Sequence, residues 1–197
     1  ARQRRVLDAV QCASQFLRER VETCLESTPT SVIPFGLDLA HYEFHEPPGV
    51  PRPAVLYVGQ LAPNKGVHIA IAALDQLKRS RGVGVTLTLV GPVTDQTYGR
   101  DLHRQVERLG LDTDIRCVGP VARRDLATFW HAHGALVFTS IWEEPFGIVP
   151  LEAMAAGLPV VGTARGGSRE ILRSEVTALT YDYQSPADCA RQLHRLV

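Results

Sequence analysis

The chain has 197 residues, enough for one substantial α/β core or for one domain with fragments of a neighbour. Lysine plus arginine and aspartate plus glutamate both number 21, so the net charge gives no reason to expect nucleic acid or an anionic membrane as the main partner. No apolar run approaches the roughly 20 residues of a membrane helix, and the first residues do not lead into a signal-peptide core. We therefore expect a soluble fragment without a transmembrane segment.

The first fifty residues differ in pattern from the rest. Residues 14–26 have helical spacing, 32–38 form a short extended run, and 45–53 form a proline-rich loop. We expect residues 31–53 to link two domains.

From residue 54 onward, short apolar runs alternate with amphipathic stretches, a pattern typical of parallel strands joined by helical crossovers. The expected strands are 54–59, 85–91, 114–118, 134–139, 159–163 and 178–181. The expected helices are 64–79, 97–109, 123–132, 150–157 and 186–196, with a shorter candidate at 168–173. Most of these strands lack polar alternation, so helices should cover both faces of the sheet.

These elements predict an α/β fold, a doubly wound, Rossmann-like parallel sheet of about six strands over residues 54–197. Leu196 and Val197 provide no helix stop signal, so we expect the domain to be truncated in its last helix.

The strongest functional signal is the stretch Glu144-Pro-Phe-Gly-Ile-Val-Pro-Leu-Glu152, between an expected strand and an expected helix. Gly147 lets a ligand approach the backbone closely, and the free N–H groups at a helix start offer a phosphate site. Pro150 fits a first helical turn, where its missing N–H costs nothing. Taken singly, Glu152 could be a first-turn partner of the helix dipole and Glu144 a solvated loop acid.

The same stretch is followed by Ala153-Met-Ala-Ala-Gly157 and by Gly166-Gly-Ser-Arg-Glu170. This combination closely resembles the group 1 family of retaining glycosyltransferases, which have the GT-B fold of two Rossmann-like domains. The resemblance covers roughly residues 30–197 and implies that the chain is the C-terminal, donor-binding half. Residues 1–30 resemble the last strand and helix of the N-terminal acceptor domain, so most of that domain is expected to be missing.

The resemblance also implies a role for each part of the E-x7-E motif. Glu144 would contact hydroxyls of the donor sugar, and Glu152 would hold the ribose hydroxyls, because a carboxylate can accept two hydrogen bonds at once. The turn would present backbone N–H groups to the diphosphate, and it consists of Phe146, Gly147, Ile148 and Val149.

Lys65 follows the strand 54–59 at the expected start of a helix. A cation there opposes the helix dipole by about 0.3–1 kcal/mol, and a bound diphosphate would reverse that sign. In the family a lysine at this position binds the diphosphate, so Lys65 and Glu144 are the residues predicted to act in catalysis. The alternative interpretation of Lys65 is an exposed surface lysine.

The chain departs from the family pattern at two positions. Gln60 stands where arginine usually follows the glycine at Gly59, so the predicted donor site loses one of its two cations. Phe35 stands where asparagine is common, and we interpret it as a variant of the hinge region.

Three glycine-containing turns are further candidates. Gly91-Pro92 and Gly119-Pro120-Val121 end two strands, where ligands of open α/β sheets bind. We expect Gly91, Pro120 and Val121 to shape the base pocket, although ordinary turns have the same composition. Gly166-Gly167 could approach the donor closely or form a plain turn.

The histidines do not indicate a metal site. His131 and His133 are two apart at the end of an expected helix, which points them in different directions and favours surface or capping roles. His41 and His45 have no third ligand nearby in sequence. Gly82-Val-Gly84 precedes a strand, so it is no dinucleotide fingerprint.

The four cysteines stand far apart, with no C-x-x-C pair. We expect reduced, mostly buried thiols and a cytosolic protein. They are Cys12, Cys24, Cys117 and Cys189.

The implied activity is transfer of a hexose from a nucleotide-diphosphate sugar to an acceptor hydroxyl, with retention of configuration, no cofactor and no obligatory metal. Helix amides and Lys65 would stabilise the leaving diphosphate, one of whose oxygens takes the acceptor's proton. The fragment alone is expected to be inactive, and the full enzyme could associate peripherally with a membrane.

Two alternatives stay open. One is a non-catalytic nucleotide-sugar-binding module that has drifted from a transferase, for which Gln60 is the argument. The other is an epimerase or a phosphorylase relative of the same architecture, against which the E-x7-E motif with Lys65 speaks. The sugar, the base and the acceptor do not follow from the sequence.

Overall fold

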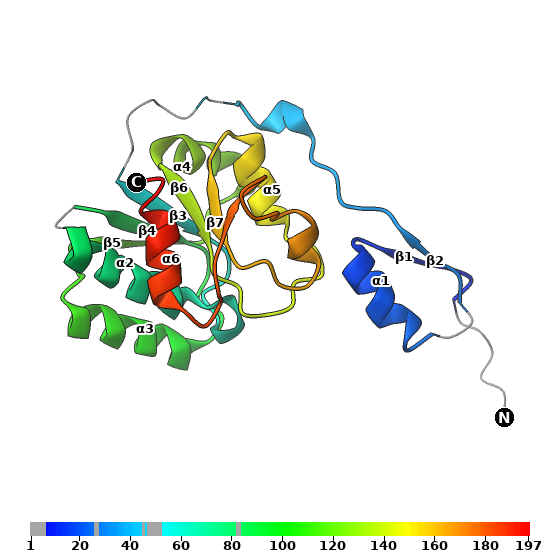
Figure 1. Ribbon diagram of the computed structural model, residues 1–197, viewed down its shortest axis with the longest axis horizontal. Coiled ribbons are helices and arrows are strands. Elements are labelled where there is room, and N and C mark those ends of the chain that lie inside the picture. The colour runs from blue at the N-terminus through cyan, green and yellow to red at the C-terminus, as the bar shows by residue number, and fades with distance from the viewer. Residues whose placement is uncertain (1–6, 26–27, 45, 47–52, 82–83) are drawn as a thin grey trace.

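The computed structural model describes residues 7–25, 28–44, 46, 53–81 and 84–197 (Figure 1). A small N-terminal unit lies beside a larger α/β domain. Most of the expected proline-rich loop, together with His45 and Gly82, lies outside the described residues.

The larger domain is built on a six-stranded parallel sheet. Its strand order is β5-β4-β3-β6-β7-β8. When β3 is counted as the first strand, this is the 3-2-1-4-5-6 arrangement of doubly wound sheets. The strands are β3 (Ala54–Val58), β4 (Thr86–Val90), β5 (Ile115–Gly119), β6 (Ala135–Phe138), β7 (Val160–Gly162) and β8 (Leu179–Thr180). Each strand begins and ends within one residue of its expected bounds, so the predicted sheet is confirmed.

Helices cover both faces of this sheet (Figure 1). The helices α2 (Val67–Arg81), α3 (Gln96–Leu109) and α6 (Pro186–Leu193) pack on one face. On the other face lie α4 (Ala127–Ala132) and α5 (Ile148–Ala155). The predicted doubly wound architecture is therefore confirmed.

The continuous apolar runs of the strands follow from two separate cores. Val55 of β3 and Val137 of β6 point into the core under α2 and α6, whereas their neighbours Leu56 and Leu136 point into the core under α4 and α5. Because successive strand residues face opposite sides, every position of a central strand must be apolar.

Glycines with positive φ shift several helix bounds from the expected ones. Gly66, with φ 65°, separates a short 3-10 helix η2 (Pro63–Lys65) from α2. Gly147, with φ 100°, caps α5, which begins two residues earlier than expected. Glu152 consequently lies in the second turn of α5, so its interpretation as a first-turn partner of the helix dipole was wrong.

Other bounds differ at the edges of the domain. The expected helix 123–132 divides into a 3-10 helix η3 (Arg123–Asp125) and α4, and the short candidate 168–173 is a 3-10 helix η4 (Gly167–Glu170). The last helix, expected to reach residue 196, ends at Leu193 with His194 as its C-cap.

The N-terminal unit is a β-α-β motif of β1 (Val10–Cys12), α1 (Gln15–Glu22) and β2 (Thr30–Val32), whose strands pair in parallel. Beyond β2 the chain is extended up to a 3-10 helix η1 (Leu39–His41). The assignment of residues 1–30 to an acceptor domain and of 31–53 to a linker stays a prediction.

Two of the four cysteines contradict the expected burial. Cys12 and Cys189 are buried, but Cys24 follows the end of α1 and Cys117 lies on the edge strand β5, and both are exposed. All four thiols are free. Within the described part of the chain, no helix has the length and apolar character needed to cross a membrane.

Candidate functional site

A cavity of about 260 Å³ opens at the carboxyl ends of the central strands β3 and β6. The strand order reverses between these two strands, and open α/β sheets bind their ligands at such a switch point. The predicted site residues that line the cavity are Gly59, Lys65, Glu144, Phe146, Gly147, Ile148 and Val149.

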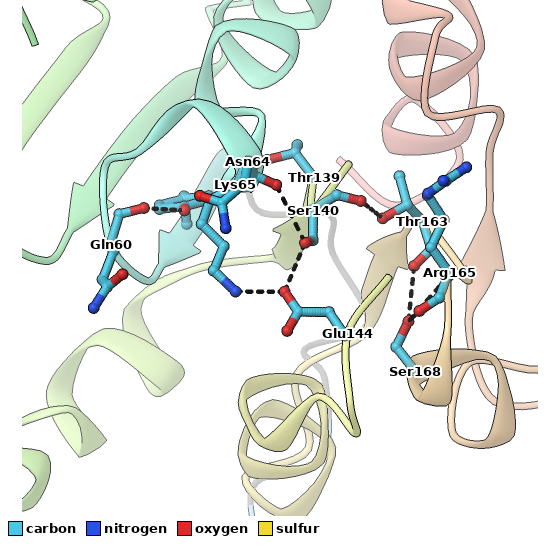
Figure 2. Close-up of polar contacts among 10 residues, drawn as sticks. Gln60, Asn64, Lys65, Thr139, Ser140, Glu144, Thr163, Arg165 and Ser168 are labelled. Carbon is cyan, nitrogen blue, oxygen red and sulfur yellow. Dashed lines mark hydrogen bonds and ion pairs between the residues drawn. The ribbon is translucent and has the colours of Figure 1, made fainter. Parts of the chain in front are cut away.

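Lys65 and Glu144 form an ion pair within this cavity (Figure 2). Lys65 Nζ lies 2.5 Å from Glu144 Oε1, and the Ser140 hydroxyl donates to the same oxygen at 2.6 Å. Glu144 is only 8% exposed, and a buried carboxylate requires such partners. The alternative interpretations, a solvated loop acid and an exposed surface lysine, do not describe these two side chains.

The loop that carries Lys65 is fixed against the end of β6. The Thr139 hydroxyl donates to Lys65 O at 2.7 Å, and Asn64 O accepts hydrogen bonds from the N–H groups of Ile141 and Trp142. A Cβ atom on Gly66 would lie 2.2 Å from Thr139 O, so only glycine permits this approach.

The start of α5 forms a second wall of the cavity, through Ile148 and Val149. Gly147 begins the helix without a side-chain cap. Backbone N–H groups at an uncapped helix start can donate to an anion, and the helix dipole favours negative charge there.

The Gly166-Gly167 turn packs behind this wall. The Gly167 N–H donates to Glu144 O at 2.6 Å, and a Cβ atom on Gly167 would lie 2.2 Å from Pro145 O. These glycines therefore allow two segments of the protein backbone to approach each other closely. Hydrogen bonds from Thr163 Oγ1 to Ser140 O and from Ser168 Oγ to Thr163 O continue the network (Figure 2).

The predicted ribose ligand Glu152 does not line this cavity. It is 5% exposed, and its Oε1 accepts from the Tyr42 hydroxyl at 2.9 Å and contacts Arg123 Nη2 at 2.6 Å. Burial raises the pKa of Tyr42 above its ordinary value. The hydrogen bond from Arg123 opposes this shift, and the hydrogen bond to Glu152 adds to it. The pKa of Arg123 is raised by its hydrogen bond to Tyr42 and by the charge of Glu152.

The remaining predicted donor residues lie apart from the ion pair. Gln60 is exposed, and Figure 2 shows its amide away from Lys65 and Glu144. Gly91 and Pro120 line another cavity, of about 460 Å³, with mainly apolar walls from α3 and from β4 and β5. Val121 is partly buried against the core under α4.

Sequence reasoning did not assign two groups of residues to the site, one of which includes the expected hinge residue Phe35. The rings of Phe35, Tyr57 and Phe138 line the cavity, and Phe35 meets Phe146 edge to face with centroids 5.4 Å apart. Burial raises the pKa of the Tyr57 phenol well above its ordinary value, so it stays neutral. The other group is Tyr42 and Arg123, whose contact with Glu152 joins distant parts of the chain and has no local signal.

The described residues hold no group of three or more histidine, cysteine or acidic side chains placed to bind a metal ion. The histidines singled out from the sequence have structural partners. His133 Nδ1 lies 2.7 Å from Phe129 O and Nε2 lies 2.9 Å from Thr88 Oγ1, while His131 Nε2 lies 2.9 Å from Glu43 O.

Fold and site together define the class: a Rossmann-like α/β domain with a charged cavity at its switch point, the architecture of one half of a GT-B glycosyltransferase. The profile of the family "Glycosyl transferases group 1" matches residues 42–197. The chain belongs to this family.

Curated relatives extend well beyond this chain. Glycogen synthase of Mycobacterium tuberculosis (strain ATCC 25618 / H37Rv) is 39% identical over 151 residues, which cover 76% of this chain and 35% of the relative. D-inositol 3-phosphate glycosyltransferase of Streptomyces bingchenggensis is 34% identical over 155 residues, which cover 75% and 34%. The chain thus spans about a third of the length of these relatives.

Solved structures show the same fold over nearly the whole chain. Anabaena Alr3699/HepE in complex with UDP-glucose aligns with a TM-score of 0.83 and 28% identity, covering 97% of this chain and 54% of that one. Sucrose-phosphate synthase from Thermosynechococcus elongatus aligns with a TM-score of 0.81 and 28% identity, covering 95% and 48%.

Proposed function

We propose that this chain is the donor-binding part of a retaining glycosyltransferase, which transfers a hexose from a nucleotide-diphosphate sugar to an acceptor hydroxyl. One observation carries the proposal. Lys65 and Glu144, which are 79 positions apart in the sequence, meet in a cavity at the switch point beside the uncapped start of α5.

Donor binding in this proposal exchanges one ion pair for another. Lys65 and Glu144 neutralise each other in the structure described. A diphosphate against the N–H groups of α5 would become the partner of Lys65, because it carries more negative charge than one carboxylate. Glu144 would then accept hydrogen bonds from the sugar hydroxyls, with the Ser140 hydroxyl still holding its Oε1.

The chemical step follows from this placement of charge. The bond between the anomeric carbon and the diphosphate oxygen breaks, and the electron pair remains on the diphosphate. Lys65 and the amides of α5 stabilise that growing charge without rearrangement. The acceptor oxygen bonds to the anomeric carbon on the same face, and its proton passes to a diphosphate oxygen. The proposed step uses no side-chain base and no metal.

The nucleotide in the proposed donor is uridine diphosphate. The support is Anabaena Alr3699/HepE, which was solved with UDP-glucose and shares 28% of its sequence with this chain. The acceptor would bind to an N-terminal domain, and the four free thiols support a reducing compartment such as the cytosol.

Calorimetric titration of the chain with UDP, GDP and ADP tests this proposal. We expect UDP to bind preferentially, and Lys65→Ala to weaken its binding by about tenfold or more, because a charged contact is lost. Lys78→Ala is the matched control, since Lys78 is also on this part of the chain and pairs with Asp114 outside the cavity. Equal UDP affinity in the wild type and Lys65→Ala would contradict the proposal.

A second candidate function is a non-catalytic nucleotide-sugar-binding module. It is favoured by Gln60, which is exposed and supplies no second cation to the cavity. Assay of the whole protein for sugar transfer and for hydrolysis of UDP-glucose separates the two functions, because a module would bind the donor without turnover.

A further inference from the structure

Glu152 stands one helical turn beyond Ile148, on the same side of α5. Four residues at 1.5 Å place it about 6 Å further along the helix than the amides proposed for the diphosphate. A ribose attached to that diphosphate would reach the level of Glu152. The carboxylate is nevertheless buried and already has partners on another side.

These partners form a closed triangle. The Tyr42 hydroxyl donates to Glu152 Oε1 at 2.9 Å, and Arg123 Nη2 lies 2.6 Å from the same oxygen. Arg123 Nη2 also donates to the Tyr42 hydroxyl at 3.0 Å. The three residues come from the segment after η1, from η3 and from α5. The triangle therefore joins three separate parts of the chain at one carboxylate oxygen.

We infer that Tyr42 and Arg123 are positioning residues for Glu152, which fix its Oε1 so that Oε2 accepts a hydrogen bond from the ribose of the donor. This inference rests on the proposed function. The contacts from Tyr42 and Arg123 both end on Oε1, and a carboxylate has acceptor capacity on each oxygen.

The charges and hydrogen bonds at the triangle favour this role. Arg123 places a positive charge 2.6 Å from Glu152 Oε1, and the raised pKa of Tyr42 keeps the phenol a hydrogen-bond donor at neutral pH. Because two donors already hold one oxygen of Glu152, its side chain loses less rotational freedom on binding the ribose than an unsupported glutamate would lose.

The opposite role, in which Tyr42 occludes Glu152, predicts an opposite result. Removal of an occluding hydroxyl would free the carboxylate and tighten nucleotide binding. Removal of a positioning hydroxyl would loosen the carboxylate and weaken binding. The sign of the change therefore decides between the two roles.

The experiment compares binding of UDP and of inorganic pyrophosphate by calorimetry in the wild type, Tyr42→Phe and Arg123→Ala. We expect UDP affinity to fall about fivefold in Tyr42→Phe and about tenfold or more in Arg123→Ala, as for loss of a neutral and of a charged hydrogen bond. Pyrophosphate, which lacks the ribose, should bind all three proteins equally.

Arg124→Ala is the matched control, because the side chain of Arg124 is 88% exposed and contacts Asp125 at 3.8 Å. Tyr42→Phe should also have no further effect on UDP affinity when it is added to Glu152→Ala, since its role depends on that carboxylate. Unchanged or tighter UDP binding in Tyr42→Phe, or an equal loss for pyrophosphate, would overturn the inference. Failure of the wild type to bind UDP would instead count against the proposed function.

Discussion

At the residue scale, the Lys65–Glu144 pair predicts opposite effects of one substitution at Glu144 on nucleotide binding and on sugar transfer. Glu144 competes with the diphosphate for Lys65, so Glu144→Gln should tighten UDP binding severalfold while lowering UDP-glucose turnover by the whole protein about 10²-fold. Calorimetry and a transfer assay measure the two effects. Glu143→Gln is the control, because Glu143 pairs with Arg20 instead of Lys65. Weaker UDP binding in Glu144→Gln would show that no such competition exists.

Gly91 provides a test of the backbone at the carboxyl ends of β3 and β4. It has φ 144°, and a Cβ atom would lie 1.9 Å from Gly59 O, so β3 and β4 can end side by side only with glycine here. Gly91→Ala should lower the free energy of unfolding by about 1–3 kcal/mol in urea titrations. Gly84→Ala, where a Cβ atom meets nothing within 4 Å, should change it by less than about 0.5 kcal/mol. Equal effects of the two variants would contradict this explanation.

Sequence reasoning found the residues of the cavity for which residue type and local pattern carry information. Lys65 and Glu144 each lie in the segment between the end of a strand and the next helix, which places them at the same edge of the sheet. Tyr42 and Arg123 could not be found this way, because Tyr42 is 110 positions from Glu152 and 81 from Arg123. Such contacts depend on where the segment that contains Tyr42 lies against the larger domain, and the hydrophobic periodicity of the sequence does not predict that position.

At the scale of elements, the start of α1 contacts the turn that contains Glu144. Ser14 Oγ accepts from the Leu17 N–H at 3.0 Å and donates to Pro145 O at 2.5 Å, while the Glu170 carboxylate accepts from the Gln15 N–H. These contacts satisfy donors that a helix start leaves free and hold the turn that contains Glu144.

Ser14→Ala should therefore change both stability and binding. Loss of the cap should lower the free energy of unfolding by about 1 kcal/mol, and loss of the Pro145 contact should weaken UDP binding. Ser185→Ala removes the equivalent cap of α6, where Ser185 Oγ accepts from the Asp188 N–H, and should lower stability alone. Denaturant titration and calorimetry check both variants, and unchanged UDP binding in Ser14→Ala would show that the turn needs no support from α1.

Two half-buried histidines make stability depend on pH. Burial lowers the pKa of His68 and of His133 below the ordinary value, with the Phe129 carbonyl opposing the shift at His133. The unfolded chain therefore takes up protons more readily than the folded chain. The contribution of these histidines to the free energy of unfolding is fully present above about pH 6.5 and is lost as the pH falls below that value.

The loss between about pH 7.5 and pH 5.5 should be smaller in His133→Asn than in the wild type. Melting temperatures at the two pH values measure it. His103→Asn, which removes an exposed histidine of α3, serves as the control and should leave the difference unchanged. A pH dependence that is the same in His133→Asn and the wild type would contradict the assigned cause.

The elements themselves were predictable to different degrees. The strands are short, apolar and buried on both faces, so their bounds follow closely from composition. The helix starts at Val67 and Ile148 were misplaced because Gly66 and Gly147 adopt positive φ, which the sequence permits but does not require. In the N-terminal unit, a strand and a helix were expected before residue 30, but the second strand β2 was not, since a strand of three residues leaves almost no pattern.

For the molecule as a whole, the described structure combines an α/β domain on a six-stranded parallel sheet with a small β-α-β unit that contacts the turn containing Glu144. About a third of the length of the curated relatives corresponds to this chain, so sugar transfer by the whole protein stays a proposal. Nucleotide binding, in contrast, should be a property of this part, because the cavity and both charges of the ion pair belong to it.

The location of bound nucleotide tests this account most directly. Amide chemical shifts of the isotope-labelled chain, recorded during titration with UDP, report which backbone N–H groups the ligand approaches. We predict that the largest changes occur at Gly147, Ile148 and Val149, with the Lys65 loop next. Changes confined to the cavity between α3 and β5, or no changes at saturating UDP, would contradict the assignment of the donor site to the carboxyl ends of β3 and β6.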